Sequence, residues 1–221
     1  MIVRLHASAD DPAISADGPA IAAAGPATVV LVRHGETDWN RQGRIQGATD
    51  IPMNGAGRGQ ARAVAERLAA DGVWSAAATS PLSRASETAT IIAQRLDLPD
   101  PAVVPGLRER RHGTLEGLTS QERRRLDAAA IPIEGVESRT AVVARAVPAL
   151  HRLGSAHAGG AVVAVTHGGV IQSLLLHLLQ RRSLPSGAVA NGSVHRFRVE
   201  PDRLVLVESD ALPLEEPTAT A

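Results

Sequence analysis

A buried strand and a polar turn are encoded together by Thr28-Val29-Val30-Leu31-Val32-Arg33-His34-Gly35-Glu36-Thr37. The segment opens with β-branched residues and leucine, which is typical of a parallel strand buried on both faces. The same pattern returns late in the chain, where residues 161–165 lead into Thr166-His167-Gly168-Gly169. Each strand therefore ends at a histidine followed by glycine, and these two strand ends guide the interpretation of the whole chain.

Around these strands, short apolar runs alternate with segments of helical spacing. Further strands are predicted at 73–79 and 102–104, with a closing pair at 194–199 and 204–207. Helices are predicted at 55–70, 83–96, 120–129, 138–153 and 170–179, with a glycine-containing loop at 107–118. This alternation predicts an α/β fold: a three-layer α/β/α sandwich with a mostly parallel central sheet. In such sheets the functional site lies beyond the carboxyl ends of the strands, where both histidines occur.

The two ends of the chain differ in composition from its centre. Residues 1–27 are rich in Ala, Asp and Pro, and residues 212–221 contain prolines and glutamates. We expect a flexible N-terminal extension at 1–27, one folded domain at 28–211 and a flexible C-terminal tail at 212–221. Aspartates near the N-terminus argue against a secretory signal, and no stretch approaches the roughly 20 apolar residues of a membrane span.

The composition excludes several classes of function. The 23 basic and 23 acidic residues cancel, so we expect neither nucleic acid nor a membrane surface as a partner. The absence of cysteine excludes disulfides, thiolate metal sites and a cysteine nucleophile, and it suits a cytoplasmic protein. The chain also lacks lysine, which excludes a Schiff-base or P-loop lysine. Aromatic residues make up only 1% of the chain, which disfavours stacking of a nucleotide base.

The turn Arg33-His34-Gly35 has the residue types that phosphoryl transfer needs. A histidine can attack phosphorus and hold the phosphoryl group, and an adjacent arginine can neutralise phosphate oxygens with its forked donors. The glycine would let the backbone approach a ligand closely. Taken singly, either strand-end histidine has a second interpretation, a buried side chain whose hydrogen bonds are satisfied. The pair favours a shared site.

These segments, with several others, resemble the histidine phosphatase superfamily, also called phosphoglycerate mutase-like. The matching pieces occur in the family's order, at residues 33–40, 46–47, 50–52, 57, 60–61, 80–89, 107–119, 134–138 and 166–169. The resemblance runs from about residue 29 to residue 205. It implies the sandwich fold described above, the phosphatase branch of the family, and neither a metal nor an organic cofactor.

The resemblance also implies a role for each polar residue of these pieces. His34 would accept the phosphoryl group, kept neutral by two neighbouring guanidinium groups that lower its pKa. Glu109 would protonate the leaving oxygen and then activate the hydrolytic water. The phosphate would lie in a positive pocket formed by Arg33, Arg84 and His167, with further contacts from Asn40, Gln46 and the backbone N–H of Gly168.

Other charged residues receive a structural interpretation. Glu36, Glu87 and Glu116 are expected to form structural hydrogen bonds, and Glu137 replaces Glu109 as the acid only if Glu109 points away. The arginines at 108, 110 and 111 are expected at the solvated surface, or in part at the mouth of the site. His195 and most other histidines are expected at the surface or in packing. Neither histidine turn is surrounded by acidic ligands, so we expect no metal ion.

Three activities remain open on the sequence. Hydrolysis is favoured over a mutase reaction because residues 119–133 form a short segment that leaves the pocket open to water. The substrate would be a small phosphorylated metabolite, such as a sugar phosphate or a phosphoglycerate-like ester. A non-catalytic interaction module is disfavoured because all five expected catalytic positions are present. A homodimer is suggested by analogy with relatives alone.

Overall fold

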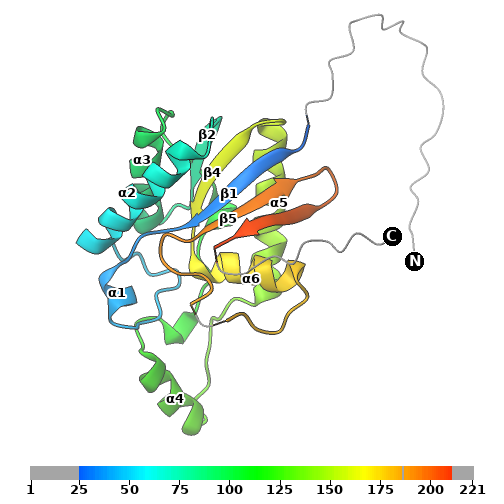
Figure 1. Cartoon of the computed structure of the whole chain (residues 1–221). Coiled ribbons are helices and arrows are strands. Elements are labelled where there is room, and N and C mark those ends of the chain that lie inside the picture. Colours follow the sequence, from blue (N-terminus) through cyan, green and yellow to red (C-terminus); the bar gives the residue numbers. More distant parts are fainter. Residues whose placement is uncertain (1–24, 186, 211–221) are drawn as a thin grey trace, which may run out of the picture.

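The computed structural model describes residues 25–185 and 187–210. Within them, the strands form a six-stranded sheet in the order β3-β2-β4-β1-β5-β6 (Figure 1). In this spatial order the strands are Ala102–Val103, Ala76–Thr79, Ala161–Thr166, Ala27–Arg33, Val194–Val199 and Leu204–Ser209. Strands β3, β2, β4 and β1 pair in parallel, whereas β5 and β6 run antiparallel to their neighbours. The predicted α/β fold with a mostly parallel sheet is confirmed.

Helices cover both faces of the sheet and complete the predicted three layers (Figure 1). Helices α2 and α3 pack on one face, and α5 and α6 pack on the other. In chain order these helices are Gly55–Ala70, Ser83–Arg95, Arg139–Ala156 and Gly168–Leu178. Strand β1 serves both layers, since Val29 and Leu31 belong to the core under α5 and α6, while Val30 and Val32 belong to the other core. Burial on both faces explains its unbroken apolar run.

The register of β1 and β4 brings the two histidine turns together. Arg33 is paired with Thr166, and the His34 N–H donates to the Thr166 carbonyl oxygen at 3.0 Å. Because both parallel strands end at this level, the rings of His34 and His167 lie 5.1 Å apart, centroid to centroid. A slip of one residue would turn every β1 side chain to the wrong layer, so the two cores fix this register.

Several element boundaries differ from the prediction. Strand β2 starts at Ala76 rather than at Val73, whose side chain is 93% exposed. The predicted loop at 107–118 overlaps two short 3₁₀ helices, η1 and η2, at Pro105–Leu107 and Gly113–Leu115. Helices α2 and α5 are N-capped by Asn54 and Ser138, whose side chains accept backbone N–H bonds at 2.9 and 3.0 Å.

Two helices flank the pocket end of the fold. The prediction misses α1 (Asp38–Arg41), which follows the His34 turn and is capped by Thr37. Helix α4 (Ser120–Ala128) is close to its predicted bounds and projects away from the body of the molecule (Figure 1). Its N-cap, Thr119, forms a capping box with Glu122. A local cap thus stabilises a helix in which no residue is buried.

The ends of the chain limit what the structure says about domain boundaries. Residues 1–24 of the predicted extension and all of the predicted tail, 212–221, lie outside the described residues. Residues just before β1 join the fold, since the Gly159 N–H donates to the Gly25 carbonyl oxygen at 2.7 Å. The domain limits 28–211 stay a prediction. Across residues 25–185 and 187–210, no helix is both long and apolar enough to cross a membrane.

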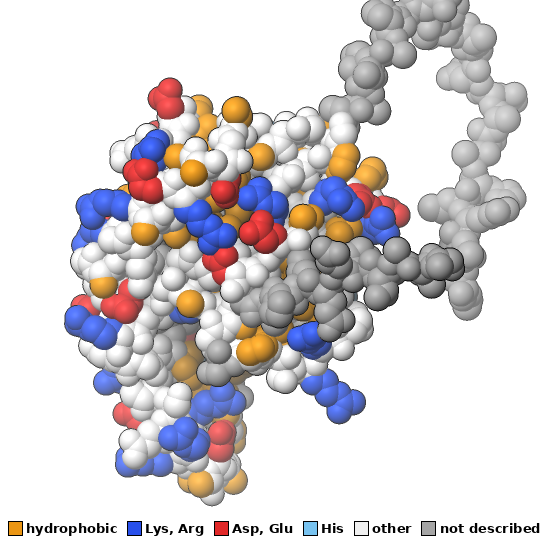
Figure 2. Space-filling model, viewed as in Figure 1, with side chains coloured by type: hydrophobic (Ala, Val, Ile, Leu, Met, Phe, Trp, Pro, Cys, Tyr) orange, Lys and Arg blue, Asp and Glu red, His pale blue; other side chains and the backbone are white. Residues whose placement is uncertain are grey.

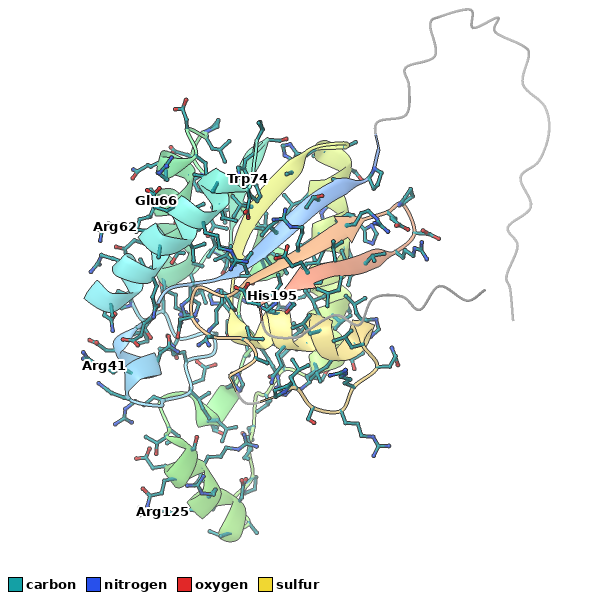
Figure 3. All side chains as sticks on the ribbon, viewed as in Figure 1. Arg41, Arg62, Glu66, Trp74, Arg125 and His195 are labelled. Atoms are coloured by element: carbon teal, nitrogen blue, oxygen red, sulfur yellow. The ribbon has the colours of Figure 1, made fainter. Side chains whose placement is uncertain are left out.

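His195 is a buried histidine of the sheet (Figure 3) and is not among the residues that line the pocket described below. Its ring nitrogens are hydrogen-bonded with the hydroxyls of Ser193 at 3.0 Å and Ser209 at 2.8 Å. Burial lowers the pKa of His195 to about 4, although the charge of Asp210 acts in the opposite direction. Of the two placements predicted for His195, at the surface or in packing, the structure shows packing.

Acidification is expected to destabilise the fold through His195. The unfolded chain binds a proton here below about pH 6.5, whereas the folded protein binds it only near a pKa of about 4, so stability falls with pH across this window. The loss reaches about 3 kcal/mol. Urea unfolding near pH 7 and near pH 4 measures it, and the non-titrating variant His195→Gln should lose about 3 kcal/mol less than the wild type. Equal losses in both proteins would contradict the assignment.

Candidate active site

A pocket of about 490 Å³ opens at the carboxyl ends of β1 and β4. All but one of the predicted site residues line it: Arg33, His34, Asn40, Gln46, Arg84, Glu109 and Gly168. The exception is His167, which is fully buried and lies against the ring of His34. The fold therefore gathers at one place the residues that the sequence distributes over β1, α1, α3, the loop before η2 and the start of α6.

His34 is oriented so that one ring nitrogen is left for the pocket. The side chain is 2% exposed, and Nδ1 lies 2.7 Å from the carbonyl oxygen of its neighbour Gly35. A carbonyl oxygen can only accept, so Nδ1 carries the proton and Nε2 keeps a lone pair. Burial holds the pKa of His34 well below its ordinary value, and the charges of Arg33 and Arg84 lower it further. The ring is neutral and nucleophilic at neutral pH.

Gly35 has a different role from the one expected. Instead of facing a ligand, it packs against the start of α2, where a Cβ atom would lie 2.3 Å from the Gly57 carbonyl oxygen. Its N–H donates to Thr88 Oγ1 at 3.1 Å. The glycine lets helix α2 approach the turn and so fixes the His34 backbone from behind. The expectation that it makes room for a ligand is wrong.

Two arginines bring positive charge to the part of the pocket beside His34. Arg33 Nη1 donates to the Val189 carbonyl oxygen at 2.6 Å. Arg84 is fully buried, and its Nη1 and Nη2 donate to the carbonyl oxygens of Thr49 and Gly47, both at 2.9 Å. Within the described residues, the buried Nε atoms of both arginines have no hydrogen-bond partner. Buried donors are nearly always paired, so these N–H groups favour an oxyanion as ligand.

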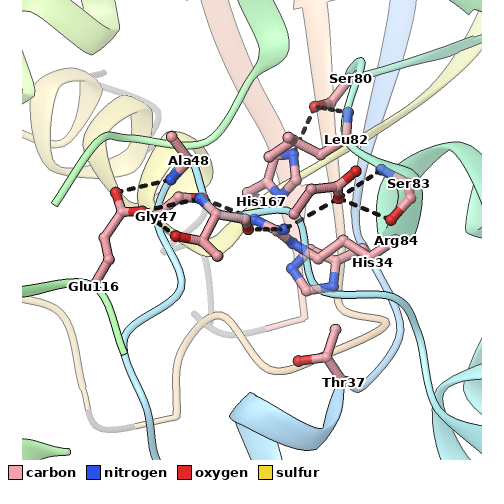
Figure 4. Close-up of polar contacts among 12 residues, drawn as sticks. His34, Thr37, Gly47, Ala48, Ser80, Leu82, Ser83, Arg84, Glu116 and His167 are labelled. Atoms are coloured by element: carbon pink, nitrogen blue, oxygen red, sulfur yellow. Dashed lines mark hydrogen bonds and ion pairs between the residues drawn. The ribbon is translucent and has the colours of Figure 1, made fainter. Parts of the chain in front are cut away.

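Arg84 is held in place by a loop that Glu116 organises (Figure 4). The Glu116 carboxylate accepts from the backbone N–H groups of Ala48 and Thr49, each at 2.9 Å, and from the Thr49 hydroxyl at 2.5 Å. It also accepts from the His112 N–H at 2.9 Å. These bonds fix the loop whose carbonyl oxygens hold Arg84. The structural role predicted for Glu116 is confirmed.

His167 is a neutral hydrogen-bonding group rather than a third cation. Its Nε2 is hydrogen-bonded with Ser80 Oγ at 2.7 Å (Figure 4), while Nδ1 is buried and has no partner among the described residues. Burial holds the pKa of His167 well below its ordinary value, and the charge of Arg84 lowers it further. The expectation that His167 contributes positive charge is wrong, because the fold buries the ring completely, and burial disfavours its charged form.

Glu109 has the environment of a carboxyl group that can hold a proton. It is 8% exposed, and its oxygens accept from the N–H groups of Arg110 at 2.7 Å and Gly169 at 3.2 Å. Burial raises the pKa of Glu109, and this outweighs the two N–H bonds and the nearby arginines, which lower it. Glu137, the alternative acid, forms a salt bridge with Arg145 at 2.8 Å, does not line the pocket, and has a lowered pKa. The geometry favours Glu109.

Gly169 leaves the space that Glu109 occupies. A Cβ at residue 169 would lie 2.6 Å from Glu109 Oε1, so alanine is expected to displace the carboxylate while the fold persists. Moving a catalytic group by about 1 Å lowers the reaction rate about 10²-fold. Gly169→Ala should therefore lower kcat for an alkyl phosphate about 10²-fold. Gly59→Ala is the matched control, because nothing lies within 4 Å of that Cβ. Wild-type kcat in Gly169→Ala would contradict the placement of Glu109.

The three remaining predicted residues line the pocket in different ways. Asn40 is fixed through its Oδ1, which accepts from the Thr37 N–H at 3.2 Å, leaving its NH₂ group free to donate. Gln46 is buried, and its Oε1 has no partner among the described residues. Gly168 opens helix α6, where the first N–H groups of a helix favour an anion.

Other charged residues can now be compared with their predictions. Glu36 accepts from Asn54 Nδ2 at 2.9 Å and Glu87 forms a salt bridge with Arg58 at 2.5 Å, so their structural roles are confirmed. The arginines at 108, 110 and 111 are not among the lining residues of the pocket. In residues 25–185 and 187–210, no three His, Asp or Glu side chains are grouped as a metal site.

The sequence did not single out part of the pocket wall. The unpredicted lining residues are Arg44, Ile45, Gly47, His112, Gly169, Gln172, Leu184, Pro185, Gly187, Ala188 and Val189. Most of them have neither a charge nor a spacing that marks them in the sequence. Gly47, His112 and Gly169 lie inside matching pieces but were assigned no role there, and Arg44 lies two residues before the piece at 46–47.

The family model of the histidine phosphatase superfamily (branch 1) matches residues 29–211. The chain belongs to this superfamily. The protein is an enzyme of the phosphatase type, as the sequence predicted.

Three similar proteins illustrate the range of this superfamily. Phosphoglycerate mutase-like protein 4 of Arabidopsis thaliana is 40% identical over 77% of this chain and 79% of its own length. The metal-independent phosphoserine phosphatase of the same plant is 36% identical over 80% and 79%. Among solved structures, a mycobacterial glucosyl-3-phosphoglycerate phosphatase in complex with VO3 is 31% identical, with a TM-score of 0.67 over 84% of this chain and 99% of that one.

Proposed function

We propose that this protein hydrolyses small phosphate monoesters without a metal, through a phosphoryl group carried by His34. The observation that carries the proposal is the state of His34: a buried, neutral ring with Nδ1–H bonded to Gly35 and Nε2 left for the pocket. Around it, buried N–H groups of Arg33 and Arg84 are without partners in the described chain. This combination suits a nucleophile attacking an oxyanion.

In the first step, His34 Nε2 attacks phosphorus and the bond from phosphorus to the ester oxygen breaks. Glu109, whose pKa is raised by burial, gives its proton to the leaving oxygen, and an alcohol departs. Charge that develops on the transferred oxygens is stabilised by Arg33, Arg84 and the Nδ1–H of His167. That N–H exists when the Ser80 hydroxyl donates to His167 Nε2, an arrangement compatible with their 2.7 Å separation.

In the second step, the Glu109 carboxylate takes a proton from water, and the water oxygen attacks phosphorus. The bond from phosphorus to Nε2 breaks, inorganic phosphate forms, and His34 returns to its neutral state. Glu109 must hold a proton in the first step and accept one in the second. A raised pKa suits this position because it brings the pKa closer to neutral pH. A carboxyl group with an ordinary pKa would be ionised before it could protonate the leaving oxygen.

Water has access to the proposed intermediate because α4 does not cover the pocket. No described residue of α4 is among the lining residues, and the helix projects into solvent with its arginines exposed (Figures 2 and 3). A mutase must shield its phosphohistidine from water until the second transfer. The open pocket therefore supports hydrolysis over the mutase reaction.

The substrate class follows from the shape of the pocket and from the relatives. A volume of about 490 Å³ accommodates a small metabolite, and neither tryptophan nor phenylalanine is among the described lining residues. Beyond the phosphate end, Arg44, His112 and Gln172 offer polar groups to the rest of the substrate. Relatives named for phosphoserine and for glucosyl-3-phosphoglycerate support a phosphorylated hydroxy acid or sugar phosphate.

We further propose a cytoplasmic location and a homodimer, neither of which the structure tests. The absence of cysteine supports the first. The analogy with relatives that suggested the dimer supports the second. Cell fractionation and the mass of the purified protein in solution would test them separately.

The test of hydrolysis is a panel of phosphate monoesters, scored by release of inorganic phosphate without added metal and again with a chelator present. We expect turnover of at least one phosphorylated hydroxy acid or sugar phosphate, unchanged by the chelator. The mutase reaction has one specific observation in its favour, the similarity to a protein named phosphoglycerate mutase-like. Interconversion of 3- and 2-phosphoglycerate faster than phosphate release would overturn the preference for hydrolysis.

A further inference from the structure

Asn191 lies where the chain enters β5, and its side chain reaches across to the His34 turn. Its Nδ2 donates to the His34 carbonyl oxygen at 2.9 Å and to Asn40 Oδ1 at 3.2 Å. The flanking backbone is fixed to Arg33, whose carbonyl oxygen accepts from the Gly192 N–H and whose N–H donates to the Ser193 carbonyl oxygen, both at 3.0 Å. The amide of Asn191 is thus held opposite the nucleophile.

We propose that Asn191 is a positioning residue that orients the Asn40 amide toward the substrate phosphate and fixes the backbone of His34. The proposal rests on the function proposed above. It adds a residue outside the recognised pieces of the sequence, contributed by the far end of the chain. Its basis is the convergence of donors on a single atom, Asn40 Oδ1.

Three donors meet at Asn40 Oδ1: the N–H and the hydroxyl of Thr37, and Nδ2 of Asn191, each at 3.2 Å. If the Asn40 amide turned over, its NH₂ group would face the Thr37 N–H and Asn191 Nδ2, which can only donate, and both of these bonds would be lost. Its oxygen would then point toward the pocket and repel a phosphate. Thr37 and Asn40 belong to one capped turn, so Asn191 alone among these donors ties the amide to the sheet.

The orientation of Asn191 itself is determined by the same rule. Its two partners, the carbonyl oxygen of His34 and Oδ1 of Asn40, can only accept. The NH₂ group must therefore face them, because a turned amide would set oxygen against oxygen. Aspartate has nearly the same shape but only acceptor atoms, so Asn191→Asp converts both attractions into repulsions. Asn191→Ala removes them without adding a charge.

The test measures kcat and KM for an accepted ester, together with the inhibition constant of orthovanadate. The variants are Asn191→Ala, Asn191→Asp, Asn40→Ala and the double variant Asn40→Ala/Asn191→Ala. Loss of hydrogen bonds to an anion-binding amide lowers kcat/KM about tenfold, so we expect this in Asn191→Ala and a larger loss in Asn191→Asp. Vanadate inhibition should weaken in parallel. Gln94→Glu, an exposed substitution on α3 that adds the same charge, should behave as wild type.

The double variant separates positioning from a purely structural role. If Asn191 acts through Asn40, the double variant should lie within about threefold of Asn40→Ala, with the remainder due to the His34 carbonyl. Losses that multiply, or an Asn191→Asp variant with wild-type kcat/KM and vanadate inhibition, would overturn the proposal. If the wild type hydrolyses no ester, the proposed function fails by itself. Direct vanadate binding by calorimetry then decides the positioning role, and equal affinity in wild type and Asn191→Asp would refute it.

Discussion

Replacing His34 with alanine is expected to lower kcat/KM by at least about 10⁴-fold for every ester that the wild type accepts, because the covalent route is lost. The pocket that remains still holds Arg33, Arg84 and Glu109. It should therefore still bind orthovanadate or phosphate, although it cannot form a bond from nitrogen to phosphorus. Retained binding with lost turnover is the signature of a nucleophile rather than of a binding group.

The matched control for this variant is His112→Ala. His112 lines the same pocket, is partly exposed and has a pKa lowered mainly by burial, yet it belongs to no proposed chemical step. We expect a change of less than about tenfold, since it removes at most one neutral contact with the substrate. A His34→Ala variant that keeps wild-type turnover would contradict covalent catalysis, and an equal loss in both variants would show that neither measurement isolates the nucleophile.

Replacing Glu109 with glutamine is expected to lower kcat about 10²- to 10⁴-fold for alkyl phosphates, because glutamine can neither give up nor accept the transferred proton. Glutamine keeps the shape of the side chain. An aryl ester with an acidic phenol needs little help to depart, so its first step should survive. The variant should then release phenol in a burst and accumulate the phosphorylated enzyme. Equal losses for alkyl and aryl esters, without a burst, would contradict the acid role.

The pH dependence of kcat/KM tests His34 and Glu109 together, because the pKa of His34 is lowered and the pKa of Glu109 is raised. The pKa of His34 is lowered, so the ring stays neutral and kcat/KM holds as the pH falls below 6.5. The pKa of Glu109 is raised above 4.5, so its proton is lost at a higher pH than usual, and activity declines as the pH rises through that value. This decline with rising pH should be absent in Glu109→Gln. Measurement of kcat/KM across the acid and neutral range decides this.

The parts of the fold that could be predicted from the sequence are those determined by local pattern. The apolar runs of β1 and β4 and the histidines at their ends define two parallel strands whose register places His34 beside His167. By contrast, α1 has only four residues and depends on the reciprocal cap between Thr37 and Asn40, which has no apolar periodicity to reveal it. Likewise, β2 begins where pairing with β4 begins, at Ala76, and not where the apolar run begins.

The parts of the site that escaped prediction depend on tertiary placement. The positive charge expected of His167 is absent because the ring is fully buried beside Arg84, a degree of desolvation that no single residue reveals. The wall formed by residues 184–185 and 187–189 contains no charged residue, so nothing in the sequence marks it as lining a polar site. Asn191 was not predicted either, because its role depends on tertiary placement. An asparagine before a glycine is typical of a turn, and only the strand pairing brings it to His34.

The account depends most directly on where the phosphoryl group is attached during turnover. Rapid quenching into base, digestion after arginine and mass spectrometry can examine the peptide from His34 to Arg41, which trypsin releases because arginines precede and end it. We expect one phosphoryl group on this peptide, labile to acid, more abundant in Glu109→Gln and missing in His34→Ala. Turnover with no phosphorylated peptide, or with the phosphoryl group on His167, would contradict it.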